Sequence, residues 1–338
     1  MEIRQLRSFV QIVDLGSFTR AAQRLNVAQP ALSQQIAALE TELEVQLLVR
    51  SPRGARPTEA GKALYRQARL ILRQAQDAGS IARAAGRAVA GSVSLGLPTS
   101  TCTMISLPLI EAVRRRHPLL RLQITESPSA HLTELTLNGR LDLAVLALEA
   151  PTRGLRAHPL LEERLFFIEQ AGATPAGAGR LRRISWKEVV HKPLALPSRP
   201  NPLRLRVDSA LAGLGLEAQV VVEVNSMGTL AELVCAGHAC SILAWSAVGR
   251  EALAGRLQLR ELTAPIVSRQ LLLCSPDTAN ADSATLAVRA LVFDTVARLV
   301  GEGAWRGARL PPGGLAAQEP AGHEAFTDAL DFREADDR

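Results

Sequence analysis

One short segment of the chain places amide and hydroxyl side chains on what its spacing predicts to be one face of a helix. Between residues 29 and 43 apolar side chains recur every three or four positions, at Leu32, Ile36, Leu39 and Leu43. The opposite face carries short or uncharged side chains, namely Gln29, Ser33, Gln34, Ala37 and Thr41. A soluble helix usually carries Lys and Glu there. Amides and hydroxyls can hydrogen-bond to base edges, so this face suits the major groove of DNA.

A second, shorter helix is predicted directly before this segment. Its apolar side chains also follow helical spacing, at Phe18, Ala21, Ala22 and Leu25. Ser17 is placed to cap its N-terminus, and Pro30 suits the first turn of the following helix, where no backbone N–H is needed. The two helices with their tight turn form a helix-turn-helix pattern. A surface helix pair in an ordinary helical domain is the alternative interpretation.

The flanking residues complete a small domain around the two helices. A preceding helix over residues 2–14 would supply a third apolar stripe, made of Leu6, Phe9, Val10 and Val13. After Glu44 the sequence VQLLVRSPRGARPTEAG predicts a two-stranded wing whose turn, residues 51–54, is rich in turn-forming residues. Arg50, Arg53 and Arg56 lie on or beside this wing, where they could contact phosphates.

With these elements in place, residues 1–61 resemble the winged helix-turn-helix of the LysR-type transcriptional regulators. The resemblance rests on Leu6, Phe9, Gly16, Ser17, Phe18, Ala21, Ala22, Leu25, Gln29, Pro30, Ala31, Ser33, Ile36, Leu39, Glu40, Arg50, Thr58 and Gly61. Two residues depart from the family pattern: Glu44 stands where Gly is usual and Leu48 where Phe is usual. We expect a DNA-binding domain over residues 1–58 that contacts operator DNA through Ser17, Thr19, Gln29, Pro30, Ser33, Gln34, Thr41, Arg50, Arg53 and Arg56.

The overall composition agrees with a DNA-binding protein. The 338 residues suggest two or three domains, and the formal net charge is +6. Residues 1–92 hold 13 Arg or Lys against 7 Asp or Glu, the largest positive density in the chain. DNA binding favours such a charge through counterion release, although RNA or anionic lipid would also suit it. No apolar run approaches membrane-spanning length, so we expect a cytoplasmic, nucleoid-associated protein without a membrane partner.

No residue pattern indicates catalysis, a metal or a cofactor. The chain has no phosphate-binding loop with Lys and no nucleophile elbow, and its six His residues are scattered. Cys235, His238 and Cys240 could be three metal ligands, but a structural zinc site needs four and no partner lies nearby. A redox pair of Cys235 and Cys240 is a further alternative. The simplest interpretation is that the four cysteines are small core residues and that the protein is not an enzyme.

A long helix is predicted over residues 59–91, which contain no proline. Its apolar side chains follow alternating steps of four and three, the period of a coiled-coil seam, at Leu64, Ala68, Ile71, Ala75, Ala78, Ala82, Ala85 and Val89. The alternative is an amphipathic helix that lies on its own domain. LysR-type regulators dimerise through a linker helix at this place, so the resemblance implies a homodimer or a tetramer that joins through Leu64, Ala68, Ile71, Ala75, Ala78 and Ala82.

From Val93 onward the pattern changes to short apolar runs separated by helical segments. The candidate strands are residues 93–97, 122–126, 142–148, 194–197, 219–224, 240–245 and 269–275. Buried runs that alternate with helices predict parallel sheets with both faces covered. The resemblance implies an effector-binding domain over 92–300, built like the periplasmic binding proteins from two Rossmann-like subdomains. Subdomain I would comprise about 92–162 and 267–300, and subdomain II about 163–266, with crossings near 162–164 and 264–267.

Ligands in such sheets bind at the C-terminal ends of strands and at helix N-termini. The loops at those positions carry Thr99, Ser100, Thr101, Ser129, Ser198, Arg199 and Asn225, which could bind a small polar or anionic effector. Arg199 would be its charge partner. Each of these residues could instead be an ordinary helix cap. The segments LPSRPN and LPLIEAVRRRHP resemble regulators close to the nitrogen assimilation control protein.

The leading hypothesis is therefore a LysR-type transcriptional regulator that binds operator DNA and responds to a small-molecule effector. A regulator without an effector, controlled by its abundance, is one alternative. A solute-binding α/β protein with a helical appendage is the other, although an appendage would have no reason to keep the face from Gln29 to Thr41 uncharged. Residues 301–338 are rich in Gly, Pro, Ala and acidic side chains, and we expect them to be mostly disordered.

Overall fold

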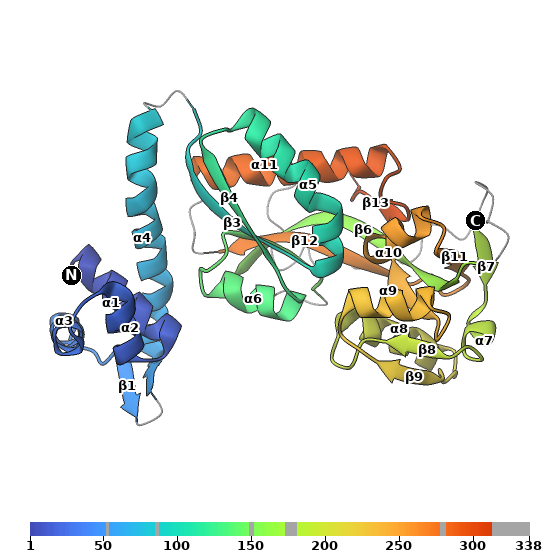
Figure 1. Cartoon of the computed structure of the whole chain (residues 1–338), viewed down its shortest axis with the longest axis horizontal. Coiled ribbons are helices and arrows are strands. Elements are labelled where there is room, and N and C mark those ends of the chain that lie inside the picture. The colour runs from blue at the N-terminus through green and yellow to red at the C-terminus, as the bar shows by residue number, and fades with distance from the viewer. Residues whose placement is uncertain (52–53, 85–87, 149–151, 173–180, 278–281, 313–338) are drawn as a thin grey trace.

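The computed structural model describes residues 1–51, 54–84, 88–148, 152–172, 181–277 and 282–312. A helical N-terminal part stands beside a long helix, and a two-lobed α/β part follows it (Figure 1). This architecture confirms the predicted fold class, a winged helix-turn-helix with a linker helix and an α/β domain. No helix among these described residues is long and apolar enough to cross a membrane.

Three helices and a hairpin form the N-terminal domain: α1 (Ile3–Leu15), α2 (Phe18–Leu25), α3 (Gln29–Glu42), β1 (Leu48–Ser51) and β2 (Gly54–Pro57). Their inward side chains form one core that includes Leu6, Phe9, Ile12, Leu32, Ile36 and Leu39. The wing is antiparallel and pairs Leu48 with Pro57. At Gly54 φ is +123°, and a Cβ there would lie 2.3 Å from the carbonyl oxygen of Gly16. Only glycine therefore allows the wing to lie this close to the end of α1.

Both departures from the family pattern are accommodated at the exit of α3. Glu44 adopts a left-handed conformation with φ of +54°, which costs a non-glycine residue about 1–2 kcal/mol. Leu48 is buried at 2% exposure in the core of the domain. The Glu40 carboxylate accepts hydrogen bonds from the backbone N–H groups of Leu47 at 2.7 Å and of Leu48 at 3.0 Å. Glu40 thus holds the base of the wing against α3.

The long helix α4 (Glu59–Ala84) only partly matches the predicted dimer seam. Its first half packs against the core of its own N-terminal domain, and Ala68 is fully buried there. Ala68 therefore cannot form a seam with a second chain, and the alternative of a helix lying on its own domain holds for this half. Ala75 and Ala78 are exposed, whereas the side chain of Ala82 lies outside the described part of the chain. For Ala75 and Ala78 the seam stays a prediction.

The first lobe of the α/β part, subdomain I, contains β3 (Gly91–Leu97), α5 (Thr99–Arg116), β4 (Leu120–Glu126), α6 (Ser129–Leu137) and β5 (Leu143–Leu146). Strand β3 pairs in parallel with β4 and with β5. Helix α11 (Ser283–Gly301) returns from the end of the domain and packs against α5. Buried aliphatic side chains of these strands and helices form the core of this lobe.

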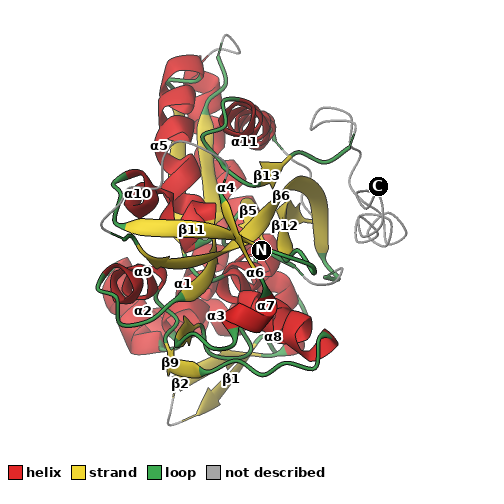
Figure 2. Ribbon diagram, turned by 90° about the vertical axis from the view of Figure 1, so that its right-hand side faces the viewer, coloured by secondary structure: helices red, strands yellow, loops and turns green. Residues whose placement is uncertain are grey.

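The second lobe, subdomain II, contains β7 (Arg182–Ile184), α7 (Trp186–Val189), β8 (Leu194–Leu196), α8 (Pro202–Gly213), β9 (Val220–Glu223), α9 (Met227–Cys235), β10 (Ser241–Ala244), α10 (Trp245–Leu253) and β11 (Leu257–Leu262). Strands β8 and β9 form a separate parallel pair. Figure 1 shows these helices and strands toward the end of the molecule opposite the DNA-binding domain, and Figure 2 views the molecule from that end. The domain boundaries themselves stay a prediction.

Two strands run through both lobes, β6 (Leu155–Gln170) and β12 (Ser268–Pro276). They are antiparallel to each other, and β12 is also antiparallel to β5. The predicted parallel pairing is therefore wrong at the crossings, because one strand leaves subdomain I and the other returns in the opposite direction. The sequence did not reveal β6, since Pro159 and the charged side chains of residues 162–164 interrupt its apolar pattern.

The expectation of disorder from Gly301 onward is wrong for residues 301–312. Trp305 is buried at 1% exposure, and β13 (Ala308–Arg309) pairs with β6 opposite Glu163 and Glu162. The Trp245 indole donates a hydrogen bond of 2.8 Å to the carbonyl of Ala304. This segment therefore packs across the crossing strand. Residues 313–338, the rest of the predicted tail, lie outside the described residues.

Candidate DNA-binding face and effector cleft

Helix α3 presents the polar face that the sequence predicts. Its inward side chains Leu32, Ile36 and Leu39 are fully buried, which fixes the rotation of the helix. Gln29, Pro30, Gln34 and Thr41 are exposed on the other side, and Ser33 is half-buried. The Gln29 amide donates to the Ser33 hydroxyl at 3.2 Å, and the Thr41 hydroxyl donates to the carbonyl of Ala37 at 2.9 Å.

Two contacts set the position of α3 and α2 within the domain. The Ser8 hydroxyl of α1 donates a hydrogen bond of 2.7 Å to the Gln35 side-chain oxygen of α3. The Ser17 hydroxyl caps α2 by accepting from the N–H of Arg20 at 3.3 Å, while Thr19 is exposed. The cap was predicted from the sequence. The Ser8 contact was missed, because no local pattern distinguishes a serine on a buried helix face from a surface serine.

Two of the three predicted phosphate-contacting arginines lie on the strands of the wing, Arg50 on β1 and Arg56 on β2. Arg50 and Arg56 are exposed, and Arg53 lies outside the described residues. The Arg50 guanidinium sits 4.3 Å above the centre of the Phe18 ring. A guanidinium stacked on an aromatic face is held in place while its N–H groups stay free for an oxyanion. Arg50 therefore joins the wing to α2 and remains available to a phosphate.

The predicted effector residues Ser100 and Thr101 lie in the first turn of α5, at the boundary between the subdomains. Ser100 belongs to a cluster of Ser100, Glu163, Ser246, Arg269 and Trp305, which we name the hinge network and in which all but the partly buried Arg269 are buried. Arg269 donates to the Ser100 hydroxyl at 2.8 Å and to the Glu163 carboxylate at 2.7 Å. Glu163 is fully buried and also accepts from the Ser246 hydroxyl at 3.1 Å and the Trp305 indole at 2.8 Å.

The hinge network connects both lobes of the α/β domain. Ser100 lies in subdomain I, whereas Ser246 lies at the start of α10 in subdomain II, and these two helices pack against each other. Glu163 and Arg269 lie on the two crossing strands. A buried charge pair of this kind is costly to break, because removing one partner leaves the other unpaired away from water. The sequence did not reveal Glu163 or Arg269, since 106 positions separate them.

Thr101 differs from its neighbours in having an unused polar atom. Its side chain is fully buried, and its hydroxyl oxygen has no hydrogen-bond partner among the described residues. Thr99 is half-buried. Ser129, from the next predicted loop, accepts a long hydrogen bond of 3.5 Å from the N–H of Ala147. Of these predicted residues, Thr101 has the unsatisfied group that a ligand could meet.

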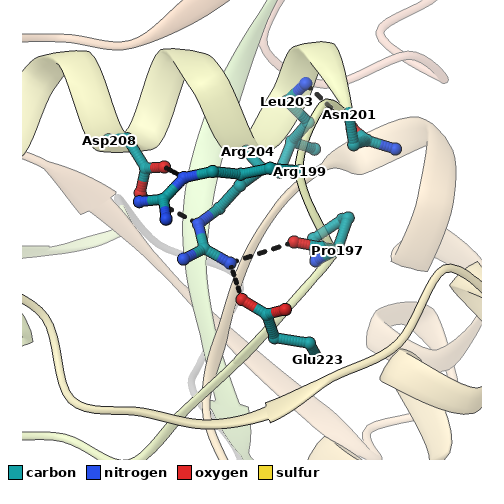
Figure 3. Close-up of polar contacts among 7 residues, drawn as sticks. All are labelled: Pro197, Arg199, Asn201, Leu203, Arg204, Asp208 and Glu223. Atoms are coloured by element: carbon teal, nitrogen blue, oxygen red, sulfur yellow. Dashed lines mark hydrogen bonds and ion pairs between the residues drawn. The ribbon is translucent and has the colours of Figure 1, made fainter.

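The predicted residues of subdomain II are held by local contacts (Figure 3). Arg199 donates to Asp208 at 2.7 Å, and the same carboxylate accepts from the buried Arg204 at 2.9 Å. Arg204 also donates to the carbonyl of Pro197 at 3.1 Å and to Glu223 at 2.6 Å. A ligand would have to compete with Asp208 for Arg199, whose side chain is 63% exposed. The role of Arg199 toward an effector stays a prediction.

The other two residues of this loop are joined to each other. The side-chain oxygen of Asn225 accepts a hydrogen bond of 3.0 Å from the backbone N–H of Ser198. Among the described residues no hydrogen bond links Ser198 or Asn225 to Ser100 or Thr101. Hydrogen bonds among the described residues therefore do not join the predicted effector residues of one subdomain to those of the other.

The cysteines lie in surroundings that suppress thiolate formation. Burial raises the pKa of Cys102, Cys235 and Cys240, and it raises the pKa of the fully buried Cys274 to about 12. Reactive cysteines need the opposite shift. Within the described ranges, no group of three side chains could hold a metal ion.

Comparison with known families agrees with this arrangement of a helix-turn-helix and an α/β domain. Residues 3–62 match the bacterial regulatory helix-turn-helix protein, lysR family, and residues 86–297 match the LysR substrate binding domain. The chain belongs to the LysR family. It is a LysR-type, DNA-binding transcriptional regulator, and its relatives are transcriptional regulators rather than enzymes.

Similar proteins cover nearly the whole length of this LysR-type chain. The nitrogen assimilation regulatory protein nac of Escherichia coli (strain K12) is 38% identical over 305 residues, which is 89% of this chain and 97% of that protein. The protein of the same name from Klebsiella aerogenes is 36% identical over 299 residues, covering 88% and 96%. These two relatives confirm the predicted similarity to nitrogen assimilation regulators.

Solved structures show the same full-length architecture. Full-length OxyR from Pseudomonas aeruginosa superimposes with a TM-score of 0.68 at 25% identity, covering 95% of this chain and 99% of that one. CbnR in complex with its target DNA has a TM-score of 0.59 at 23% identity, covering 88% and 99%, and supports the fold alone.

Proposed function

We propose that α3 reads the operator in the major groove, with Gln29, Ser33, Gln34 and Thr41 facing base edges. Ser17, Thr19 and Pro30 would contact DNA beside it, and Arg50, Arg53 and Arg56 would contact phosphates. The observation that carries this proposal is the uncharged, exposed face of α3 opposite three fully buried leucine and isoleucine side chains. Such a face can approach base edges closely without burying an unpaired charge.

Binding-site selection with the full-length protein on fragmented genomic DNA tests this proposal. We expect recovery of a symmetric motif whose half-sites are spaced by whole helical turns, because LysR-type regulators bind as oligomers. The same selection with Ser33→Ala should return a motif that is degenerate at one position in each half-site. Recovery of random fragments by the wild-type protein would contradict base reading by α3.

We propose that two chains associate through the exposed part of α4 that contains Ala75 and Ala78. Both side chains are small and exposed, so a second helix could approach closely there. Ala75→Glu should dissociate the dimer, because the carboxylate would be buried without a partner. Ala63→Glu is the matched control, since Ala63 is exposed on the same helix outside the predicted seam. Equal dimer dissociation constants in sedimentation equilibrium would contradict this interface.

We propose that a small polar or anionic effector binds at the boundary of the subdomains near Thr101. The buried hydroxyl of Thr101, which has no partner among the described residues, supports this position. A charged group is also near, because Arg269 donates a hydrogen bond to the neighbouring residue Ser100. A specific observation favours the alternative of control by abundance: Arg269 is already paired with Glu163, and Arg199 with Asp208. A ligand must therefore replace existing contacts.

Promoter output at matched protein levels separates the two modes of control. Thr101→Val keeps the shape of the side chain but removes the hydroxyl, so an effector-controlled regulator should lose its response across growth conditions. Thr103→Val on the same helix is the control, because Thr103 is exposed and its hydroxyl donates to the carbonyl of Thr99. An unchanged response in Thr101→Val would favour control by abundance.

We propose that the target genes serve nitrogen assimilation and that the protein acts in the cytoplasm on the nucleoid, without enzymatic activity. The support is the 38% identity to a nitrogen assimilation regulatory protein over most of both chains. Chromatin immunoprecipitation from cells grown with limiting and with abundant ammonium tests the target class. Occupied sites that avoid genes for nitrogen uptake and metabolism would contradict it.

A further inference from the structure

A cavity of about 760 Å³ lies between the DNA-binding part and subdomain I. One wall comes from α1, α2 and α4, which contribute Arg7, Arg24 and Arg69. The other wall comes from β3, β4 and the turn after α6, which contribute Arg121 and Arg140. Figure 1 shows α4 standing beside the edge of the sheet formed by β3 and β4. Cavities of about 300–1,000 Å³ are typical of small-molecule sites.

The lining of this cavity is strongly positive. It contains five guanidinium groups and a single carboxylate, Asp142. Asp142 is itself buried and accepts hydrogen bonds from the N–H of Ser94 at 2.8 Å and from its hydroxyl at 2.9 Å. In the described part of the chain Arg7, Arg24, Arg121 and Arg140 form no ion pair, as the pairs found there involve other residues. Like charges gathered in a partly enclosed space repel one another.

Arg69 adds an independent sign of a missing acceptor. Its Nη1 atom pairs with Asp14 at 3.3 Å, but its buried Nε has no hydrogen-bond partner among the described residues. A buried donor without an acceptor is destabilising, because it has lost its hydrogen bonds to water. Gln123 and Thr125 on β4 place further neutral polar groups on the same lining. An anion in the cavity would supply acceptors to these groups.

We propose that this cavity binds a small polyanion that carries phosphate groups and joins the DNA-binding domain to subdomain I. Guanidinium groups bind phosphate oxygens through paired N–H donors, and they keep their charge at every physiological pH. Several unpaired guanidiniums facing one space suit a ligand with two or more phosphate groups better than a single carboxylate.

The position of the cavity makes such a ligand a means of regulation. Its arginines come from both sides of the domain boundary, so the complete site exists only while α1, α2 and α4 face β4 as they do here. A ligand that binds one arrangement better than another shifts the equilibrium toward it. The bound polyanion would therefore stabilise this orientation of the DNA-binding domain. This site is separate from the effector position near Thr101.

Calorimetric titration of the full-length protein with inorganic pyrophosphate at low ionic strength tests the proposal. The test variant is the double substitution Arg121→Gln and Arg140→Gln, both exposed and both outside the DNA-binding domain. The matched control is Arg114→Gln with Arg115→Gln, which removes the same charge from exposed positions on α5. We expect the test variant to bind pyrophosphate about tenfold more weakly or worse, and the control to bind like the wild type. Circular dichroism establishes that each variant is folded.

Three outcomes would overturn the proposal. The first is that the wild type releases no binding heat with millimolar pyrophosphate. The second is that both double variants weaken binding equally, which would indicate general charge attraction rather than a specific site. The third outcome identifies a different source of phosphate. If short random duplex DNA competes with pyrophosphate, and the test variant loses DNA affinity while the control does not, the cavity contacts the DNA backbone. Pyrophosphate binding that survives saturating DNA supports a small-molecule site.

Discussion

The polar face of α3 and the hinge network differ in how their polar side chains are placed: those of α3 are mostly exposed to solvent, and those of the hinge network are mostly buried. Gln29, Gln34 and Thr41 come from one stretch of chain and remain exposed. Glu163 and Arg269 come from distant segments, are buried or nearly so, and satisfy each other. A surface that must recognise an external partner keeps its donors and acceptors in solvent until the partner arrives. A cluster that holds two lobes together uses them internally.

The difference has an energetic consequence for mutations. If α3 reads the operator as proposed, a truncation on its exposed face should remove a contact with DNA and leave the free protein almost unchanged, because the side chain is already hydrated. A truncation in the hinge network leaves a buried partner unsatisfied, which costs the free protein its stability. Substitutions in the two regions should therefore separate cleanly into binding defects and folding defects.

The largest effect should come from Trp305→Ala. The substitution removes a side chain that is 1% exposed, and with it the hydrogen bond of 2.8 Å that the indole N–H donates to Glu163. We expect the free energy of unfolding to fall by about 3–5 kcal/mol, measured by urea denaturation. Arg298→Ala is the control, because its exposed pair with Glu302 should contribute less than about 1 kcal/mol. Equal stabilities of the two variants would show that residues 301–312 pack only loosely.

A smaller and different effect should follow from Gln34→Ala. The exposed amide should contribute about 1–3 kcal/mol at a single base pair if it contacts the base directly, with no change in urea stability. Gln67→Ala, exposed on α4, is the matched control. Electrophoretic titration of the operator and of operators altered at each position measures the loss. A uniform loss on all sequences would mean that Gln34 contacts the backbone rather than a base.

The smallest effect should come from Arg50→Ala. Loss of one phosphate contact should weaken specific and random DNA alike and reduce the slope of affinity against salt concentration by about 1. The stacked ring of Phe18 remains, so the fold of the domain should be kept. Arg114→Ala, exposed on α5, removes an equal charge away from the wing. A loss of sequence preference in Arg50→Ala would place this arginine at a base edge.

Local sequence patterns were enough to predict the elements of the DNA-binding domain and several strands and helices of the α/β domain. Helix periodicity at Leu32, Ile36 and Leu39 is a short-range property, so it predicted which face of α3 is buried and which is exposed. The strands β3 and β8 were predicted for the same reason, since a run of largely buried apolar residues between turns needs no distant information.

Contacts between residues far apart in the chain could not be predicted from local patterns and became known from the folded structure. The strand β6 is stabilised by pairing with β12, β11 and β13. Its own sequence carries charged residues, which by local patterns would predict a loop. Ala68 fits a dimer seam by spacing, yet the core of its own domain covers it completely. Glu163, Arg269 and Trp305 appear unrelated along the chain. Their pairing depends on two crossing strands and a returning segment, and a buried charge selects its partner by proximity in space rather than in sequence.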